Sequence, residues 1–352
     1  MAKINIEWLL RPNIRDLVPY SSARSEYTGK DMIYLDANEN SFGSAAEGNY
    51  SRYPDPQQTA LKDVIGKIKG VDKNRIFLGN GSDEPIDLLI RSFCEPGKDN
   101  ILILPPTYGM YEVSARINDV AVKKVLLTND FQVDVEQVLA EADVQTKLLF
   151  ICSPNNPTGN LVDEDAIVVL LDRFEGIVIL DEAYIDFAGG HSFADRLDIY
   201  NNLVILQTFS KAWGLAGLRL GMAFAAPEII AILNKVKAPY NINAATQEIA
   251  IQALSSNEFI DSKTKLILLE REKLETELAE FSFVIRIFPS QANFLLVRVA
   301  DAAELYAYLK LRGIIVRNRS KEAKCESCLR ITVGTPQENN QLINALKQYS
   351  DE

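Results

Sequence analysis

The sequence predicts an α/β protein with a mostly parallel sheet, followed by a second, smaller α+β domain. Short and nearly unbroken apolar runs alternate with stretches of helical periodicity through the middle of the chain. Strands of a parallel sheet have this pattern because helices cover both of their faces. A long charged helix then interrupts the alternation, and the length of 352 residues is typical of about two domains.

The elements of the first domain can be assigned in chain order from these runs. The predicted strands are Ile101–Leu104, Leu148–Cys152, Ile177–Leu180, Val204–Gln207 and Leu220–Ala225, and the predicted helices include Tyr108–Ile117, Glu164–Phe174 and Pro227–Lys235. Functional residues of such sheets gather in the loops at the carboxyl ends of the strands.

The second domain begins with a helix predicted over Ser262–Phe281, which we interpret as the domain connector. The strands expected after it are Phe283–Phe288, Asn293–Val299, Ile314–Arg317 and Leu329–Val333. The segment from Met1 to Met32 has no obvious partner of its own and is expected to pack there. The predicted division is therefore a large domain at 33–261 and a small domain formed by 1–32 and 262–352.

Composition excludes several classes of protein. The formal net charge of −11 argues against non-specific binding to nucleic acid or to an anionic membrane. The amino terminus has no secretory signal pattern, and no apolar run is long enough for a membrane span, so we expect a cytoplasmic protein. Cys325 and Cys328 form a CxxC, but His191 is the only histidine and lies far away in sequence, so we predict no metal site.

The most informative segment runs from Gln207 to Arg219. Lys211 follows a predicted strand, and a lysine amine that loses its proton readily can form a Schiff base with an aldehyde cofactor. Thr208, Ser210 and Arg219 could hold the phosphate of that cofactor. An isolated Ser-Lys pair would be read as a surface feature, so the interpretation depends on the motifs upstream.

Two upstream motifs offer groups for a phosphate and for a ring face. The glycine turn before Ser82 and Asp83 opens a helix whose first N–H groups can bind phosphate, although both residues could simply cap that helix. Tyr108 follows a strand and a Pro-Pro pair. Its ring could stack on an aromatic cofactor or belong to the core.

Two further motifs offer groups for the edge of the ring. Asn156 lies in a turn held by two prolines and a glycine, which suits an amide donor but also an ordinary turn. Asp181 ends a buried strand, where a carboxylate is costly without a cationic partner such as a pyridinium N–H; it could instead cap a helix. Tyr184 could reach the same oxygen as Asn156. Together the motifs provide every group that a pyridoxal phosphate site needs.

In this order, the motifs SPNNPTG, DEAY, TFSKAWGLAGLR and LRITVGT resemble those of fold-type I pyridoxal-phosphate aminotransferases, from about Tyr20 to Thr335. Within that superfamily the chain most resembles the histidinol-phosphate aminotransferases, through Val18–Tyr20, Leu35–Asn40, Arg52–Pro56 and Val316–Arg319. The resemblance implies a large domain whose mostly parallel, seven-stranded sheet lies between helices.

The resemblance also implies a role for individual residues. Lys211 would hold the cofactor as a Schiff base and shuttle the proton, and Asp181 would pair with the ring nitrogen. Tyr53 would reach the phosphate from a neighbouring subunit, which implies a homodimer. The other implied cofactor contacts are Ser82, Asp83, Tyr108, Asn156, Tyr184, Thr208, Ser210 and Arg219, and the implied substrate contacts are Tyr20, Asn38, Arg317 and Arg330. Arg317 is favoured over Arg319 as a substrate contact.

The implied reaction transfers an amino group between L-histidinol phosphate and 2-oxoglutarate in histidine biosynthesis, by a ping-pong cycle. The cofactor motifs do not separate this activity from an aromatic-amino-acid aminotransferase or a threonine-phosphate decarboxylase. A ligand-sensing regulator would need a DNA-binding module, for which an acidic chain of this length offers no candidate.

Overall fold

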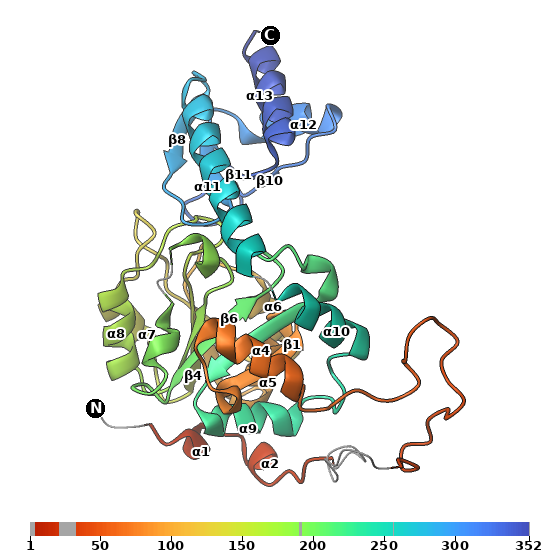
Figure 1. The fold of residues 1–352 in the computed structure, drawn as a ribbon. Coiled ribbons are helices and arrows are strands. Elements are labelled where there is room, and N and C mark those ends of the chain that lie inside the picture. The colour runs from red at the N-terminus through yellow and green to blue at the C-terminus, as the bar shows by residue number, and fades with distance from the viewer. Residues whose placement is uncertain (1–3, 21–32, 190–191, 256, 352) are drawn as a thin grey trace.

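The computed structural model describes residues 4–20, 33–189, 192–255 and 257–351, and its larger part is built on one seven-stranded sheet (Figure 1). The strand order is β1-β7-β6-β5-β4-β2-β3, and only β7 runs antiparallel to its neighbours. The strands are β1 Ile76–Asn80, β2 Asn100–Ile103, β3 Ala121–Lys124, β4 Thr146–Cys152, β5 Ile177–Asp181, β6 Leu203–Thr208 and β7 Leu220–Ala225. The predicted fold class, including the seven-stranded and mostly parallel sheet, is confirmed.

Helices cover both faces of this sheet and bury alternate strand residues in two separate cores. Phe77 and Ile179 belong to one core, while Leu78 and Val178 belong to the other, as the two-residue period of a strand requires. The helices α5 Asp83–Phe93, α6 Met110–Ile117 and α9 Pro227–Val236 contribute to the first core, and α4 Thr59–Lys69, α7 Val135–Glu141 and α8 Glu164–Arg173 contribute to the second. Helix α10 Ala244–Ala253 packs beside α4.

The smaller part is a four-stranded antiparallel sheet of order β10-β11-β9-β8 with its own helices (Figure 1). Its core includes Leu274, Leu305 and Leu346, which are all buried. Its elements are α11 Asn257–Ala279, β8 Val284–Phe288, β9 Phe294–Val299, α12 Ala302–Leu311, β10 Arg317–Asn318, β11 Cys328–Thr332 and α13 Pro336–Asp351. The predicted strand at Ile314–Arg317 is wrong for its first three residues, because only Arg317 and Asn318 pair with β11.

The amino-terminal segment packs against helices α5 and α9 of the larger part, not in the small domain as predicted. Ile6, Leu10 and Ile14 are buried in the same core as residues of α5 and α9. Ile6 belongs to the short helix α1 Ile6–Leu9, and Ile14 belongs to α2 Pro12–Arg15. Leu10 lies in extended backbone between the two helices, and burial of the three apolar side chains favours this packing of the segment. The correction applies to residues 4–20, since 1–3 and 21–32 lie outside the described residues, as does His191.

The predicted boundary at residue 262 falls inside α11, so the division of the chain into domains stays a prediction. Across the described ranges, no helix combines the length and apolar character needed to cross a membrane. The cysteines of the CxxC, Cys325 and Cys328, are buried free thiols.

Candidate active site

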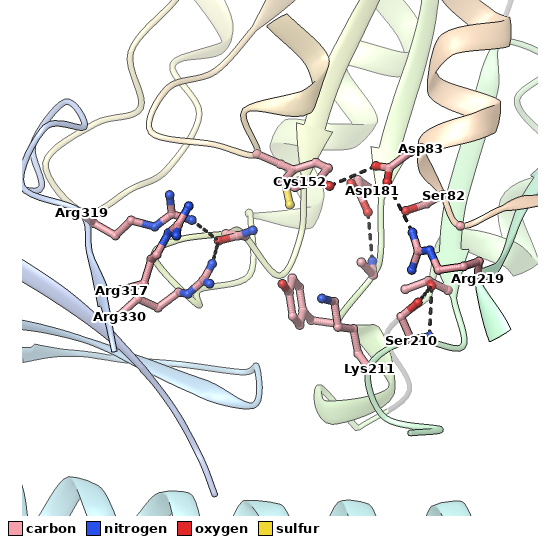
Figure 2. A pocket seen from close by; sticks show the side chains of 16 residues that line it. Ser82, Asp83, Cys152, Asp181, Ser210, Lys211, Arg219, Arg317, Arg319 and Arg330 are labelled. Carbon is pink, nitrogen blue, oxygen red and sulfur yellow. Dashed lines mark hydrogen bonds and ion pairs between the residues drawn. The ribbon is translucent and has the colours of Figure 1, made fainter. Parts of the chain in front are cut away.

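A cavity of about 380 Å³ lies where the carboxyl ends of the sheet strands face β10 and β11 of the small sheet (Figure 2). Lys211 stands between two groups of side chains: Ser82, Asp83, Ser210 and Arg219 on one side and three arginines on the other. The predicted residues that line the cavity are Ser82, Asp83, Tyr108, Asn156, Asp181, Tyr184, Thr208, Ser210, Lys211, Arg219, Arg317 and Arg330.

One end of the cavity is a cradle for an anion at the amino terminus of α5. Gly81 has a φ of +71°, and a Cβ atom there would come within 2.7 Å of Arg219 Nη2. Gly221, on the neighbouring strand, would place a Cβ only 2.3 Å from the Ser82 backbone nitrogen. Both glycines are therefore required, because a side chain at either position would collide with the neighbouring backbone or with the Arg219 guanidinium. Free N–H groups at the start of a helix, beside a guanidinium, attract phosphate.

Hydroxyl groups complete this cradle. Thr208 ends β6, and its Oγ1 accepts a bond of 3.1 Å from the Ser210 backbone N–H while it lies 3.0 Å from Ser210 Oγ. Arg219 lies 3.7 Å from the Asp83 carboxylate across the rim. The cradle thus offers hydroxyl, amide and guanidinium donors, and phosphate binding by these residues stays a prediction.

Lys211 projects into the cavity between its two ends. Its Nζ lies 5.6 Å from the centre of the Tyr184 ring. Partial burial and the nearby positive charge of Arg330 lower the pKa of Lys211. The amine is consequently neutral more often than an ordinary lysine, which a nucleophile and proton carrier requires.

Asp181 is a buried carboxylate at the end of β5. Burial raises its pKa to about 6, although it accepts hydrogen bonds from Tyr111 Oη at 2.6 Å and from the Ala183 N–H at 3.1 Å. Among the described residues, Asp181 forms no ion pair. A cationic group within the cavity, such as a protonated ring nitrogen, would therefore relieve the cost of its burial.

Asn156 connects the Lys211 region to the arginines. Its Oδ1 accepts hydrogen bonds from Arg330 Nη1 and, at 3.4 Å, from Arg319 Nη2. Because the oxygen is occupied in this way, the amide nitrogen is the atom that Asn156 can offer to a ligand. Tyr184 lies close by, and burial raises the pKa of its hydroxyl, so that it remains a donor at neutral pH.

Tyr108 lies on a wall of the cavity and is anchored at both its hydroxyl and its ring. Its Oη donates to Asp83 Oδ1 at 3.0 Å, and its ring meets that of Tyr111 edge-on with centres 5.5 Å apart. These contacts hold the ring at the cavity. Stacking on a cofactor ring stays a prediction.

Three predicted residues do not line this cavity in the chain that carries them. Asn38 and Tyr53 line a separate hollow beside α10, where the Tyr53 ring stacks on Tyr240 with centres 4.5 Å apart. Tyr20 is 78% exposed. The roles proposed for them therefore depend on a neighbouring subunit or a movement of the amino-terminal segment.

Sequence reasoning missed Tyr111 and Cys152, and it placed Arg319 behind Arg317. Arg319 lines the cavity together with Cys152, Arg317 and Arg330. The two-residue spacing of Arg317 and Arg319 was a signal that both could share a face in extended backbone, although only Arg317 belongs to β10. Tyr111 gave no comparable signal, because a tyrosine on the apolar face of a helix usually belongs to the core.

The residues of the cavity fit pyridoxal phosphate. The glycine cradle would hold the phosphate, Asp181 would pair with the ring nitrogen, and Lys211 would hold the aldehyde carbon. Asn156 and Tyr184 would face the phenolic oxygen. This fit rests on two observations: the buried Asp181 has no ion pair within the described ranges, and the cradle is one that a Cβ would fill.

Comparison with known proteins agrees with this geometry. Residues 26–346 match the aminotransferase class I and II family. A histidinol-phosphate aminotransferase of Cytophaga hutchinsonii is 54% identical over 345 residues, which cover 98% of this chain and 99% of that protein.

Solved structures show the same likeness. The histidinol-phosphate aminotransferase from Clostridium acetobutylicum superposes with a TM-score of 0.80 at 28% identity, over 86% of this chain and 91% of that one. The enzyme of that name from Sinorhizobium meliloti, solved with pyridoxal-5'-phosphate, has the same fold, with a TM-score of 0.79 at 23% identity over 97% of both chains.

Proposed function

The chain belongs to the class I and II aminotransferases, and from this premise we propose that it transfers an amino group between L-histidinol phosphate and 2-oxoglutarate. The products are imidazole acetol phosphate and glutamate, and the reaction belongs to histidine biosynthesis. Relatives of that name at 54% identity over nearly the whole chain support this assignment over an aromatic-amino-acid aminotransferase.

The observation that carries the proposal is the presence of two cationic ends on opposite sides of Lys211 (Figure 2). One end is the glycine cradle with Arg219, which suits a cofactor phosphate. The other end holds Arg317, Arg319 and Arg330, which suit the anion of a substrate. A reaction between a phosphorylated cofactor and a phosphorylated amine would use both ends, one for each phosphate.

The cofactor of this reaction is pyridoxal phosphate. When bound, it supplies an aldehyde for Lys211 and a protonated ring that draws electrons away from the α-carbon of the substrate. Asp181 would keep the ring nitrogen protonated, because its buried carboxylate forms no ion pair among the described residues. The Asn156 amide and the Tyr184 hydroxyl would donate to the phenolic oxygen.

Lys211 performs the proton transfer. Once the amine of the substrate has taken the place of Lys211 on the aldehyde carbon, the freed Nζ would take the proton from the α-carbon of the substrate and return it one carbon away. The lowered pKa of Lys211 keeps part of the amine neutral for this step. The arginines hold the anion of the substrate, so that the α-hydrogen faces Nζ. Glutamate and 2-oxoglutarate use the same site to complete the ping-pong cycle.

We further propose that the enzyme is a homodimer in which Tyr53 reaches the phosphate site of the neighbouring subunit. Tyr53 is 50% exposed, and the segment that carries it extends away from the body of its own chain (Figure 1). Arg52 braces this segment through a 2.7 Å ion pair with Glu39. The cytoplasmic location stays a prediction.

Steady-state transfer to 2-oxoglutarate tests the function directly. We expect kcat/KM for L-histidinol phosphate to exceed the value for L-phenylalanine by at least about a hundredfold, because phenylalanine offers no phosphate to the three arginines. Comparable or reversed values would replace the proposal with an aromatic aminotransferase. Release of carbon dioxide from threonine phosphate without an oxo-acid acceptor would instead identify a decarboxylase.

A further inference from the structure

The three arginines of the substrate end lie on one face of the small sheet. Arg317 of β10 pairs directly with Arg330 of β11, and the Arg319 N–H donates to the Cys328 carbonyl at 2.8 Å. Arg319 lies just beyond the end of β10, but its backbone hydrogen bond to Cys328 continues the pairing with β11, and all three guanidinium groups line the cavity. Arg319 is therefore part of the cavity wall, and its position is fixed by the sheet.

A single carboxylate at this end holds Arg319. Glu322 Oε1 accepts from Arg319 Nη1 at 2.6 Å, and both side chains are mostly buried, with 19% of Arg319 and 27% of Glu322 exposed. The opposite end of the guanidinium reaches Asn156 Oδ1. Because Glu322 holds Nη1 and Asn156 holds Nη2, the Arg319 guanidinium keeps a defined orientation at the cavity.

The charges of this end do not balance without a ligand. Three guanidinium groups and one carboxylate leave a net charge of two positive units. Burial and the neighbouring Arg319 lower the pKa of Arg330, which reflects the repulsion within the group. In the part of the chain that the structure describes, Arg319 Nε and Arg330 Nε are buried without a hydrogen-bond partner. Like charges and unmade hydrogen bonds destabilise a site unless an anion arrives.

A phosphate monoester can supply the negative charge and the hydrogen-bond acceptors that the three arginines lack. Near neutral pH it carries close to two negative charges and has three terminal oxygens that accept charge-assisted hydrogen bonds. A carboxylate carries one charge and has two oxygens, which a single arginine satisfies in a bidentate pair. A third guanidinium thus benefits a phosphate more than it benefits a carboxylate.

We propose that Arg319, held by Glu322, is a specificity-determining residue that contacts the phosphate of the amino donor and distinguishes it from the carboxylates of glutamate. This inference rests on the proposed function, because it assigns a substrate contact within that same site. If Arg319 only oriented Asn156, its loss would slow both half-reactions equally. A direct contact with the phosphate predicts a larger effect on the half-reaction of the phosphorylated donor.

The test compares the two half-reactions in holoenzyme carrying Arg319→Gln, each followed by the change in cofactor absorbance. We expect the rate constant per substrate concentration to fall at least about tenfold for L-histidinol phosphate, and less than about threefold for glutamate and for L-histidinol, which lacks the phosphate. The control is Arg173→Gln, which removes an exposed arginine paired with Glu136 and should alter none of these rates. An equal loss of rate in both half-reactions would overturn the proposal and leave Arg319 with the role of orienting Asn156.

Inorganic phosphate gives a second readout that does not depend on the identity of the substrate. Its inhibition constant against the glutamate half-reaction should rise at least about fivefold in Arg319→Gln, with the cofactor spectrum unchanged. An unchanged inhibition constant would contradict the phosphate contact. If the wild-type enzyme shows no preference for histidinol phosphate while the inhibition constant still rises, the proposed function fails and the anion site remains.

Glu322→Gln keeps the test decisive if the arginine variant does not bind cofactor. The substitution retains the shape of the side chain and removes the charge that anchors Arg319 Nη1. We expect a loss of selectivity for histidinol phosphate over glutamate, because the released guanidinium no longer has a fixed orientation. Unchanged selectivity would refute the role of the pair.

Discussion

Asp181→Asn should make the cofactor-free protein more stable while it destroys the catalytic site. The carboxylate is buried without an ion pair among the described residues, and burial raises its pKa from 3.8 to about 6. A carboxyl group whose folded pKa is raised binds more protons in the folded state than in the unfolded state. Its effect on stability is therefore a penalty that grows as pH rises from about 4 to 6.

The size of this stability penalty follows from the change in the pKa of Asp181 on folding. At 1.36 kcal/mol per pH unit, the rise from 3.8 to about 6 corresponds to about 3 kcal/mol above pH 6. An amide at this position avoids the penalty and can still bond to Tyr111, whose hydroxyl both donates and accepts. We therefore expect a net gain of about 1–3 kcal/mol at pH 8, because weaker neutral hydrogen bonds offset part of the gain.

Urea unfolding of both cofactor-free proteins, at one protein concentration, measures this difference. The gain should fall to about half at pH 5, where the folded carboxylate is largely protonated. Added pyridoxal phosphate should reduce or reverse the difference in unfolding free energy between the variant and the wild type, since only the wild type offers a charged partner for the ring nitrogen. A variant that is folded but no more stable than the wild type at pH 8 would refute the reasoning.

Three further substitutions test other parts of the site. Lys211→Ala should abolish transamination and the visible absorbance of the bound cofactor, and retention of both would rule out the assigned role. Arg330→Ala should slow both half-reactions by at least about tenfold, whereas a normal glutamate half-reaction would disprove a shared anion pocket. Gly221→Ala should destabilise the protein by about 1–3 kcal/mol and weaken cofactor binding measured by fluorescence titration, because its Cβ would lie 2.3 Å from the Gly81 backbone. The matched Gly217→Ala, whose Cβ meets nothing within 4 Å, should do neither, and equal losses in both variants would contradict the cradle argument.

The sequence by itself determined the sheet and most of the cofactor site. Apolar runs such as Leu148–Cys152 and Ile177–Leu180 are buried on both faces, so their local pattern specifies strands without reference to the rest of the chain. Asn156 and Asp181 follow these strands, and parallel strands bring their carboxyl ends to one edge. Order and spacing along the chain were therefore sufficient to bring these residues together.

Only the tertiary structure decided the contacts that depend on register or on packing between distant segments. The pairing of β10 with β11 turns Arg319 into the cavity, and a slip of one residue would have turned it away. Tyr111 reaches Asp181 across 70 positions of sequence, and Ile6, Leu10 and Ile14 join the core beside α5 and α9 because that surface completes their burial. Such contacts depend on how well two surfaces fit each other. The local sequence pattern describes one of these surfaces and does not say which other segment will pack against it.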